Sequence, residues 1–235
     1  MLPQVISILS SACLLPEFSS ASDLSALYKK YIPPVIARSC NTAVKMALTV
    51  ASQVVENHSI DYAVFCSEHG ELNCGVSLLT DLSRGELLSP SDFSHSVHNT
   101  ASGIFSIVHK LQQNMTSIAS GKNTFLTGVV SALTWLKLHP DNQALLTIFD
   151  DHIPTEYQSL NLSSDQQYAV AFLLSTQVIR KKMFSVNIVD CLDNSESENK
   201  IAGALLFYDW LNGAGVEFLT QGDCCKRIAW KRNHI

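Results

Sequence analysis

The sequence predicts an α/β domain built on one parallel or mixed sheet with helices on both faces. Two observations support this fold class. Some segments are short and apolar without polar alternation, which is typical of strands covered on both faces. They alternate along the chain with longer segments whose apolar residues recur at helical spacing. The 235 residues contain neither a low-complexity linker nor an internal repeat, so we expect one domain spanning 1–235.

The first part of the chain opens with an expected strand at 5–9. A Pro-Pro pair then precedes a long segment with one apolar face, which predicts a helix over 35–56. The segment DYAVFCS at 61–67 predicts a strand buried on both faces, and a helix over 74–84 follows it.

The stretch 89–136 organises the middle of the chain as helix, strand, sharp turn and helix. Apolar residues at helical spacing predict a helix over 103–111, and 115–119 is short and apolar enough for a strand. The turn Ser-Gly-Lys-Asn at 120–123 leads into a second helix, over 125–136. Many enzymes present a nucleophile at such a strand-to-helix turn, because the helix N-terminus lowers its pKa. This turn contains no Cys, and we expect none of the seven cysteines at a helix N-terminus.

The remaining elements follow the same alternation up to a basic end. They are strands at 143–150, 168–175 and 184–189, a helix at 202–211 and a short strand at 216–220. The basic tail Lys226, Arg227, Lys231 and Arg232 is interpreted as a solvated end that could attract an acidic partner surface.

Charge and composition exclude some function classes. A net charge of −5 gives no electrostatic support for nucleic-acid binding. Only 16% of the residues are charged, below the ~25% typical of soluble domains, which indicates burial against a partner. No segment reaches the ~20 apolar residues that span a bilayer.

The cysteines and the N-terminus indicate the cytoplasm. Seven cysteines, including the adjacent Cys224 and Cys225, are an odd number and are interpreted as reduced thiols. Residues before Cys13 resemble a lipoprotein cleavage site, which leaves a lipid-anchored periplasmic protein as one interpretation. No Lys or Arg precedes Lys29, however, so a buried first strand is favoured.

Isolated polar clusters carry little chemistry. Cys66, His69 and Cys74 are too few for a closed zinc site, so we expect no metal and no cofactor. His95 and His98 are interpreted as hydrogen-bonded structural residues. The run Asp150-Asp151-His152 ends a strand where α/β sites usually lie, although a solvated loop is favoured.

Three motifs resemble the N-terminal half of the β-ketoacyl synthases. They are FCSEHGEL at 65–72, SPSDFSHSVHNTASGIFSI at 89–107 and TSIASGKNTFLTGVVSAL at 116–133. The sequence is most similar to short ketosynthase-like proteins of aryl polyene pathways, most clearly over 63–154. The resemblance implies an α/β, thiolase-like fold: the ketosynthase N-terminal half, with a mixed sheet and helices on both faces.

The same resemblance implies that ketosynthase chemistry is missing. Lys122 falls, within a residue or two, where the family has its nucleophilic Cys. The family's two catalytic His residues belong to a C-terminal half, which the residues after Pro154 are too few to supply, and His234 is no substitute. The site is therefore expected to hold no catalytic residue.

The expected role is that of a chain-length-factor-like subunit, which pairs as a heterodimer with an active β-ketoacyl synthase and meets acyl carrier protein through the complex. Six residues are predicted near the tunnel or interface, namely Phe93, His98, Asn99, Met115, Ile118 and Lys122. Phe93 would present a ring to the acyl chain, and Asn99 would tie the start of its helix to the neighbouring turn. The alternative is a small acyltransferase acting on acyl carrier protein, with Ser120 or a distant Cys as nucleophile.

Overall fold

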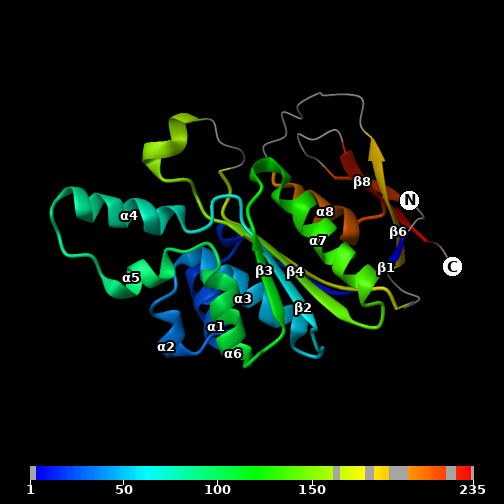
Figure 1. Cartoon of the computed structure of the whole chain (residues 1–235), viewed down its shortest axis with the longest axis horizontal. Helices are drawn as coiled ribbons and strands as arrows, with labels where there is room; N and C mark the ends of the chain where they lie inside the picture. Colours follow the sequence, from blue (N-terminus) through cyan, green and yellow to red (C-terminus); the bar gives the residue numbers. More distant parts are fainter. Residues whose placement is uncertain (1–3, 161–164, 178–182, 191–200, 221–225, 234–235) are drawn as a thin grey trace.

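A computed structural model describes residues 4–160, 165–177, 183–190, 201–220 and 226–233. Within these ranges eight strands form one sheet in the order β3-β2-β4-β5-β1-β6-β8-β7 (Figure 1). The strands are β1 Gln4–Leu14, β2 Tyr62–Cys66, β3 Asn114–Ile118, β4 Gln143–Asp150, β5 Tyr168–Ser175, β6 Met183–Asp190, β7 Glu217–Leu219 and β8 Lys226–Arg232.

The sheet is mixed, as the sequence predicts. Strands β3, β2 and β4 run parallel to one another, and β5 pairs antiparallel with both β4 and β1. Strands β6, β8 and β7 extend the sheet beyond β1 by further antiparallel pairs. The parallel part brings the carboxyl ends of β2 and β4 together at one edge, where the site described below lies.

Helices cover both faces of this sheet (Figure 1). Helices α7 (Thr124–Leu138) and α8 (Gly203–Asn212) pack on one face. Helices α3 (Thr42–Val55) and α6 (Thr100–His109) pack on the other, with α1 (Ala21–Tyr31) beside α3. Alternate residues of β2 and β5 enter the two cores, so these strands are apolar throughout.

Helices α4 (Leu72–Ser83) and α5 (Pro90–His95) form a pair that we call the arm. The arm extends away from the sheet (Figure 1), and within α4 only Leu78 is buried. Short 3₁₀ turns lie at Pro16–Phe18, Gly121–Asn123 and Thr155–Leu160. No helix in the described ranges is long and apolar enough to cross a membrane.

The first strand is longer than predicted, and its side chains change face partway along it. Ile6 and Ile8 enter the core under α8, whereas Ala12 and Leu14 enter the opposite core. A bulge between Ile8 and Ser10 shifts the register by one residue and so reverses the side-chain alternation. The apolar pattern is broken at this point, which is why only 5–9 is recognisable as a strand in the sequence.

The predicted helix over 35–56 is wrong in its first part. The chain forms a short helix α2 (Pro34–Ala37), breaks, and restarts as α3. The Asn41 Oδ1 accepts a hydrogen bond from the Val44 backbone N–H at 2.9 Å, which caps the new helix at its start. Helix α1 is absent from the prediction, although Leu24, Leu27, Tyr28 and Tyr31 form a helical stripe that packs against the core.

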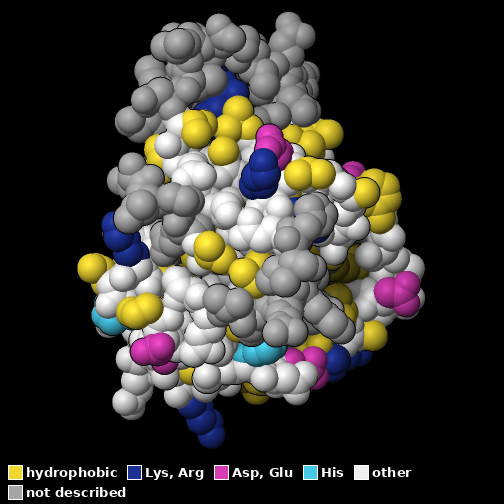
Figure 2. Space-filling view, turned by 90° about the vertical axis from the view of Figure 1, so that its right-hand side faces the viewer, with side chains coloured by type: hydrophobic (Ala, Val, Ile, Leu, Met, Phe, Trp, Pro, Cys, Tyr) yellow, Lys and Arg dark blue, Asp and Glu magenta, His cyan; other side chains and the backbone are white. Residues whose placement is uncertain are grey.

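The basic tail is not a solvated end. Residues Lys226–Arg232 form β8, in which Ile228 and Trp230 are buried. The four basic residues belong to a strand in the interior of the sheet, between β6 and β7. Figure 2 faces this side of the molecule, where basic, acidic and hydrophobic side chains are interspersed among the residues that the structure describes.

Candidate functional site

The predicted nucleophile position lies in the turn between β3 and α7. Gly121 adopts a φ of +53°, and the Thr124 Oγ1 donates to the Gly121 carbonyl at 2.6 Å while accepting from the Ser120 N–H at 3.0 Å. The turn is thus held by its own polar groups. Lys122 is exposed on it, so an ammonium stands where a thiol would be expected.

The four cysteines in the described ranges are free thiols, and none is activated. Burial raises the pKa of Cys13 to about 12 and raises the pKa values of Cys40, Cys66 and Cys74 as well. Contrary to the sequence expectation, Cys74 does lie in the first turn of a helix, α4. Its pKa is nevertheless raised by burial and then by the nearby carboxylates of Glu71 and Asp92. Cys191, Cys224, Cys225 and His234 lie outside the described residues.

Strand β3 is an edge strand and carries two of the predicted residues on opposite faces. Met115 packs toward α3 and α6, whereas Ile118 packs toward α7. Because side chains alternate along a strand, residues three apart cannot share a face, and the period alone could have shown this. The two residues therefore do not line one continuous wall within this chain.

The carboxyl ends of β2 and β4 meet at Asp150, which is only 4% exposed. Its carboxylate accepts hydrogen bonds from the Ser67 hydroxyl at 2.7 Å and from the backbone N–H groups of Glu68 and His69 at 3.1 and 3.0 Å. Burial raises the pKa of Asp150, although the bonds from His69, Ser67 and Glu68 act to lower it. The favoured solvated-loop interpretation is wrong for Asp150 but fits His152, which is exposed.

The hydrogen bonds around Asp150 and Ser67 fix the loop that contacts the ring of His98. Ser67 Oγ also accepts from the Gly70 N–H at 2.7 Å, and Gly70 has a φ of +56°. A Cβ on Gly70 would lie 2.5 Å from Nδ1 of His98, so the glycine permits close contact with that ring. The Nε2 atoms of His69 and His98 and the Nδ1 of His95 are buried without a hydrogen-bond partner among the described residues. The expectation of hydrogen-bonded structural histidines is therefore not met by these ring nitrogens.

Asn99 does not act as predicted. Its side chain makes no capping bond to α6, and it is exposed. The Thr100 Oγ1 instead ties the helix start to the preceding turn, by donating to the carbonyls of His95 and Val97 at 2.8 and 2.7 Å.

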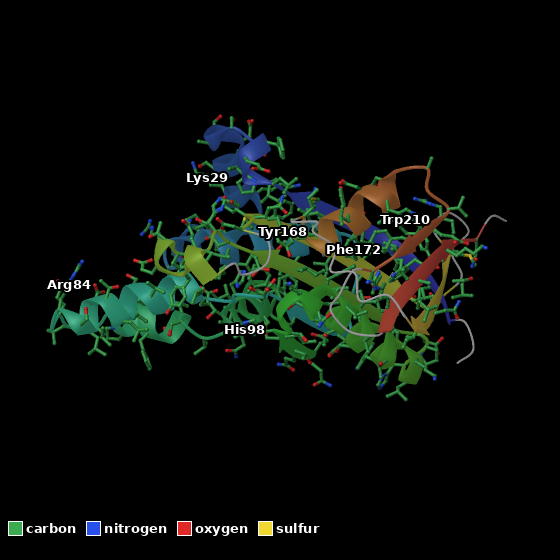
Figure 3. The ribbon with its side chains drawn as sticks, turned by 90° about the horizontal axis from the view of Figure 1, so that it is seen from above. Lys29, Arg84, His98, Tyr168, Phe172 and Trp210 are labelled. Carbon is green, nitrogen blue, oxygen red and sulfur yellow. The ribbon has the colours of Figure 1, made fainter. Side chains whose placement is uncertain are left out.

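The arm presents apolar side chains to solvent. Phe93 on α5 is 65% exposed, which excludes the interpretation that its ring belongs to the core of this chain. The other exposed apolar residues of the arm and the turn after it are Leu79, Leu82, Leu87 and Val97. Seen from above in Figure 3, the arm and α7 lie along the same side of the molecule, with His98 near the base of the arm and Lys29 of α1 on the opposite side. Exposed apolar area of this kind marks interaction surfaces.

A cavity of about 220 Å³ lies where the arm joins the body. It is lined by residues from α3, α4, α5 and α6 and the segments before them, among them Cys40, Asn41, Glu71, Cys74, Asp92 and His95. Glu71 is 7% exposed, and burial raises its pKa to about 7. The sequence gives no sign of this role for Glu71 or Asn41, since the helices that bring them together are far apart along the chain.

No metal site is formed in the described part of the chain, where no group of three or more His, Cys, Asp or Glu side chains could hold an ion. Cys66 faces Gly128 of α7, whereas Cys74 lies in the cavity beside the arm. Cys66 and Cys74, which stand close together with His69 in the sequence, therefore lie on different sides of the fold.

Comparison with known proteins agrees with this geometry. Residues 16–221 match the family described as β-ketoacyl synthase, N-terminal domain. No curated protein is similar enough in sequence to count as a relative.

Solved structures with the same fold include a chain from "Ketosynthase (ApeO) in Complex with its Chain Length Factor (ApeC) from Xenorhabdus doucetiae". It is 24% identical with a TM-score of 0.79, and the match covers 99% of this chain and 100% of that one. The ishigamide ketosynthase/chain length factor is 13% identical with a TM-score of 0.63, covering 81% of this chain and 68% of that one. A β-ketoacyl synthase from Burkholderia phymatum STM815 is 11% identical with a TM-score of 0.59, covering 82% of this chain and 65% of that one. The fold is thus thiolase-like, and the chain belongs to the β-ketoacyl synthase family, whose N-terminal domain it matches over most of its length.

Proposed function

We propose that this chain is a non-catalytic, chain-length-factor-like subunit that pairs with an active β-ketoacyl synthase. In that complex it would shape the tunnel for the growing acyl or polyene chain in carrier-protein-dependent, cytoplasmic aryl polyene biosynthesis, which resembles fatty-acid elongation. The observation that carries the proposal is the turn at 120–123, which presents Lys122 in place of a thiol. The raised pKa values of the four described thiols support it, because the thiolate is the reactive form.

The second part of the chain supports the same conclusion. After Pro154, the described strands β5, β6, β7 and β8 join the one sheet, and α8 packs on it. These elements do not build a second copy of the fold. The elements on which the family's catalytic His residues would lie are therefore not present within the described part of this chain.

The surface supports pairing with a partner. In the described residues, β3 pairs on one side only, with β2, and its outer edge offers unpaired backbone N–H and C=O groups. The arm, which carries exposed apolar residues, extends from the side of the sheet where β3 lies (Figure 1). An edge strand beside an apolar surface is suited to a second sheet from another chain. One of the similar structures is itself described as a ketosynthase in complex with its chain length factor.

Nothing in the described residues favours the alternative of a small acyltransferase. Ser120 is exposed, and no described side chain hydrogen-bonds to its Oγ, so no base is in place to activate it.

The test is co-expression with the ketosynthase of the same pathway, followed by intact-mass analysis after treatment with a ketosynthase-directed inhibitor and acylated carrier protein. We expect a stable one-to-one complex in which only the ketosynthase carries the label. Specific labelling of this chain, or a monomer that ignores the ketosynthase, would contradict the proposal.

A further inference from the structure

The cavity at the base of the arm contains a buried carboxylate with one oxygen in use. Glu71 Oε2 accepts a hydrogen bond from Asn41 Nδ2, while Asn41 Oδ1 is occupied by the cap of α3. No described residue donates a hydrogen bond to Oε1 of Glu71. A buried carboxylate with so few donors is unfavourable in its charged form, which is why its neutral form persists to an unusually high pH.

The other groups facing this carboxylate add acceptors and no cation. The Asp92 and His95 side chains come from α5, Cys74 from α4 and Cys40 from the turn before α3, and Asp151 adds a further negative charge from the end of β4. No Lys or Arg lines the cavity in the described residues; Lys45 lies near Cys40 but outside the lining. Within the described part of the chain, His95 Nδ1 is buried without a hydrogen-bond partner.

The cavity is also placed beside a surface that needs a partner. Asp92 is exposed on α5, next to the exposed ring of Phe93. A protein that covers the apolar side of the arm would therefore pass the cavity.

From this geometry we propose that the cavity is a socket for a cationic side chain, arginine or lysine, donated by the partner ketosynthase. This inference rests on the proposed pairing and adds the chemistry by which the partner is recognised. A guanidinium suits the site well, because its several N–H donors can reach Glu71, Asp92 and other acceptors at once.

The proposal has a consequence for pH. In the free chain the pKa of Glu71 is about 7, and a cation in the socket would lower it. Binding then releases a proton, so the complex should tighten as pH rises towards 7 and level off above it. The expected loss of affinity at pH 6 relative to pH 8 is about tenfold, because about nine-tenths of Glu71 is ionised at pH 8 and about one-tenth at pH 6.

The experiment measures the affinity of the full chain for the ketosynthase between pH 6 and 8, with and without millimolar ethylguanidinium, and with neutral ethylurea as the matched probe. For the wild type we expect the pH dependence and a weakening by ethylguanidinium alone. Glu71→Gln, which keeps the size of the side chain and the acceptor for Asn41, should bind at least fivefold more weakly at pH 8 and lose both effects. Glu17→Gln makes the same change on an exposed residue and should behave as wild type.

Equal affinity of wild type and Glu71→Gln at every pH, without competition by ethylguanidinium, would overturn the socket while leaving the pairing intact. If no complex forms at all, the proposed function fails. In that case thermal melting of the free chain shows whether the cavity binds a cation at all. A midpoint raised by ethylguanidinium in wild type but not in Glu71→Gln means that the cavity binds a free cation. No shift means that it binds none. Either result overturns the partner-side-chain proposal.

Discussion

At the scale of single residues, Gly128 of α7 permits a close approach between this helix and the sheet. A Cβ at this position would lie 2.5 Å from Sγ of Cys66 and 3.0 Å from Cδ1 of Leu146. Both neighbours are fully buried in strands, so neither can move away easily. The absence of a side chain therefore allows α7 to lie directly on β2 and β4.

We predict that Gly128→Ala lowers the free energy of unfolding by ~1–3 kcal/mol, because the added methyl group overpacks the core. Adding Cys66→Ala should recover part of this loss, since it removes the closer atom. Gly103→Ala is the control: it lies within α6, nothing lies within 4 Å of the added Cβ, and it should stabilise the chain by ~0.5–1 kcal/mol. Denaturant unfolding of the three variants measures these values, and a neutral Gly128→Ala would show that the helix can shift.

Asp150 is a second residue on which local order depends, and the sequence predicts it only in part. An acidic residue at the end of an apolar strand marks the position as unusual. That it would be buried, with three donors converging on it, follows from the meeting of β2, β4 and β5, which no local pattern describes.

At the scale of elements, α8 and β8 stabilise each other through Arg232. Its side chain donates to four backbone carbonyls at the end of α8, those of Trp210, Leu211, Gly213 and Gly215, at 2.5–3.0 Å. Its guanidinium also lies over the Trp210 ring, 4.8 Å from the centroid. A helix C-terminus leaves carbonyls without partners and carries partial negative charge, so a planar cation satisfies both needs.

We expect Arg232→Ala to lower the free energy of unfolding by ~2–4 kcal/mol, because it leaves these carbonyls unsatisfied and removes the ring contact. Arg232→Lys should cost less, though still more than ~1 kcal/mol, since an ammonium keeps the charge and loses the fork. Arg84→Ala, at the exposed tip of the arm (Figure 3), is the control and should stay within about 0.5 kcal/mol of wild type. Thermal and denaturant melts of the three variants test the order; an Arg232→Ala protein as stable as Arg84→Ala would show that the cap is dispensable.

At the scale of the whole molecule, the arm is the part of the described chain whose exposed apolar residues a partner would cover. Its exposed apolar residues contribute little to the stability of the free chain, since they are already in water. Their apolar area would be removed from water only in a complex. This agrees with the low charge content of the sequence, which indicates burial against a partner.

Phe93 tests this view within the complex. We predict that Phe93→Ala leaves the stability of the free chain within about 0.5 kcal/mol of wild type, because the ring is 65% exposed. If the ring forms a wall of the tunnel, the complex with the ketosynthase should stay intact and make longer products. Phe18→Ala removes a ring outside the arm that is even more exposed, at 78%, and should change neither property. Thermal midpoint, complex yield and product length are measured together, and unchanged product length from an intact complex would mean that the tunnel runs elsewhere.

The sequence by itself determined the type of most elements. Largely apolar runs without polar alternation, such as 143–150 and 168–175, predict strands covered on both faces, and the structure has both with these limits. The turn without a thiol was equally legible, because it depends on residue identity alone.

Only the tertiary structure decided which segments meet. Strand β1 lies between β5 and β6, and its residues before Cys13 supply the pairing with β6, so cleavage at Cys13 would open the middle of the sheet. The basic run near the end of the chain became an interior strand that caps α8, and Glu71 met Asn41 across two helix starts. These outcomes depend on contacts between residues tens to hundreds of positions apart, where burial and partner geometry override local charge. The sequence pattern of a segment indicates whether it prefers a helix or a strand. Which other segment it packs against is determined by the packing of the whole sheet.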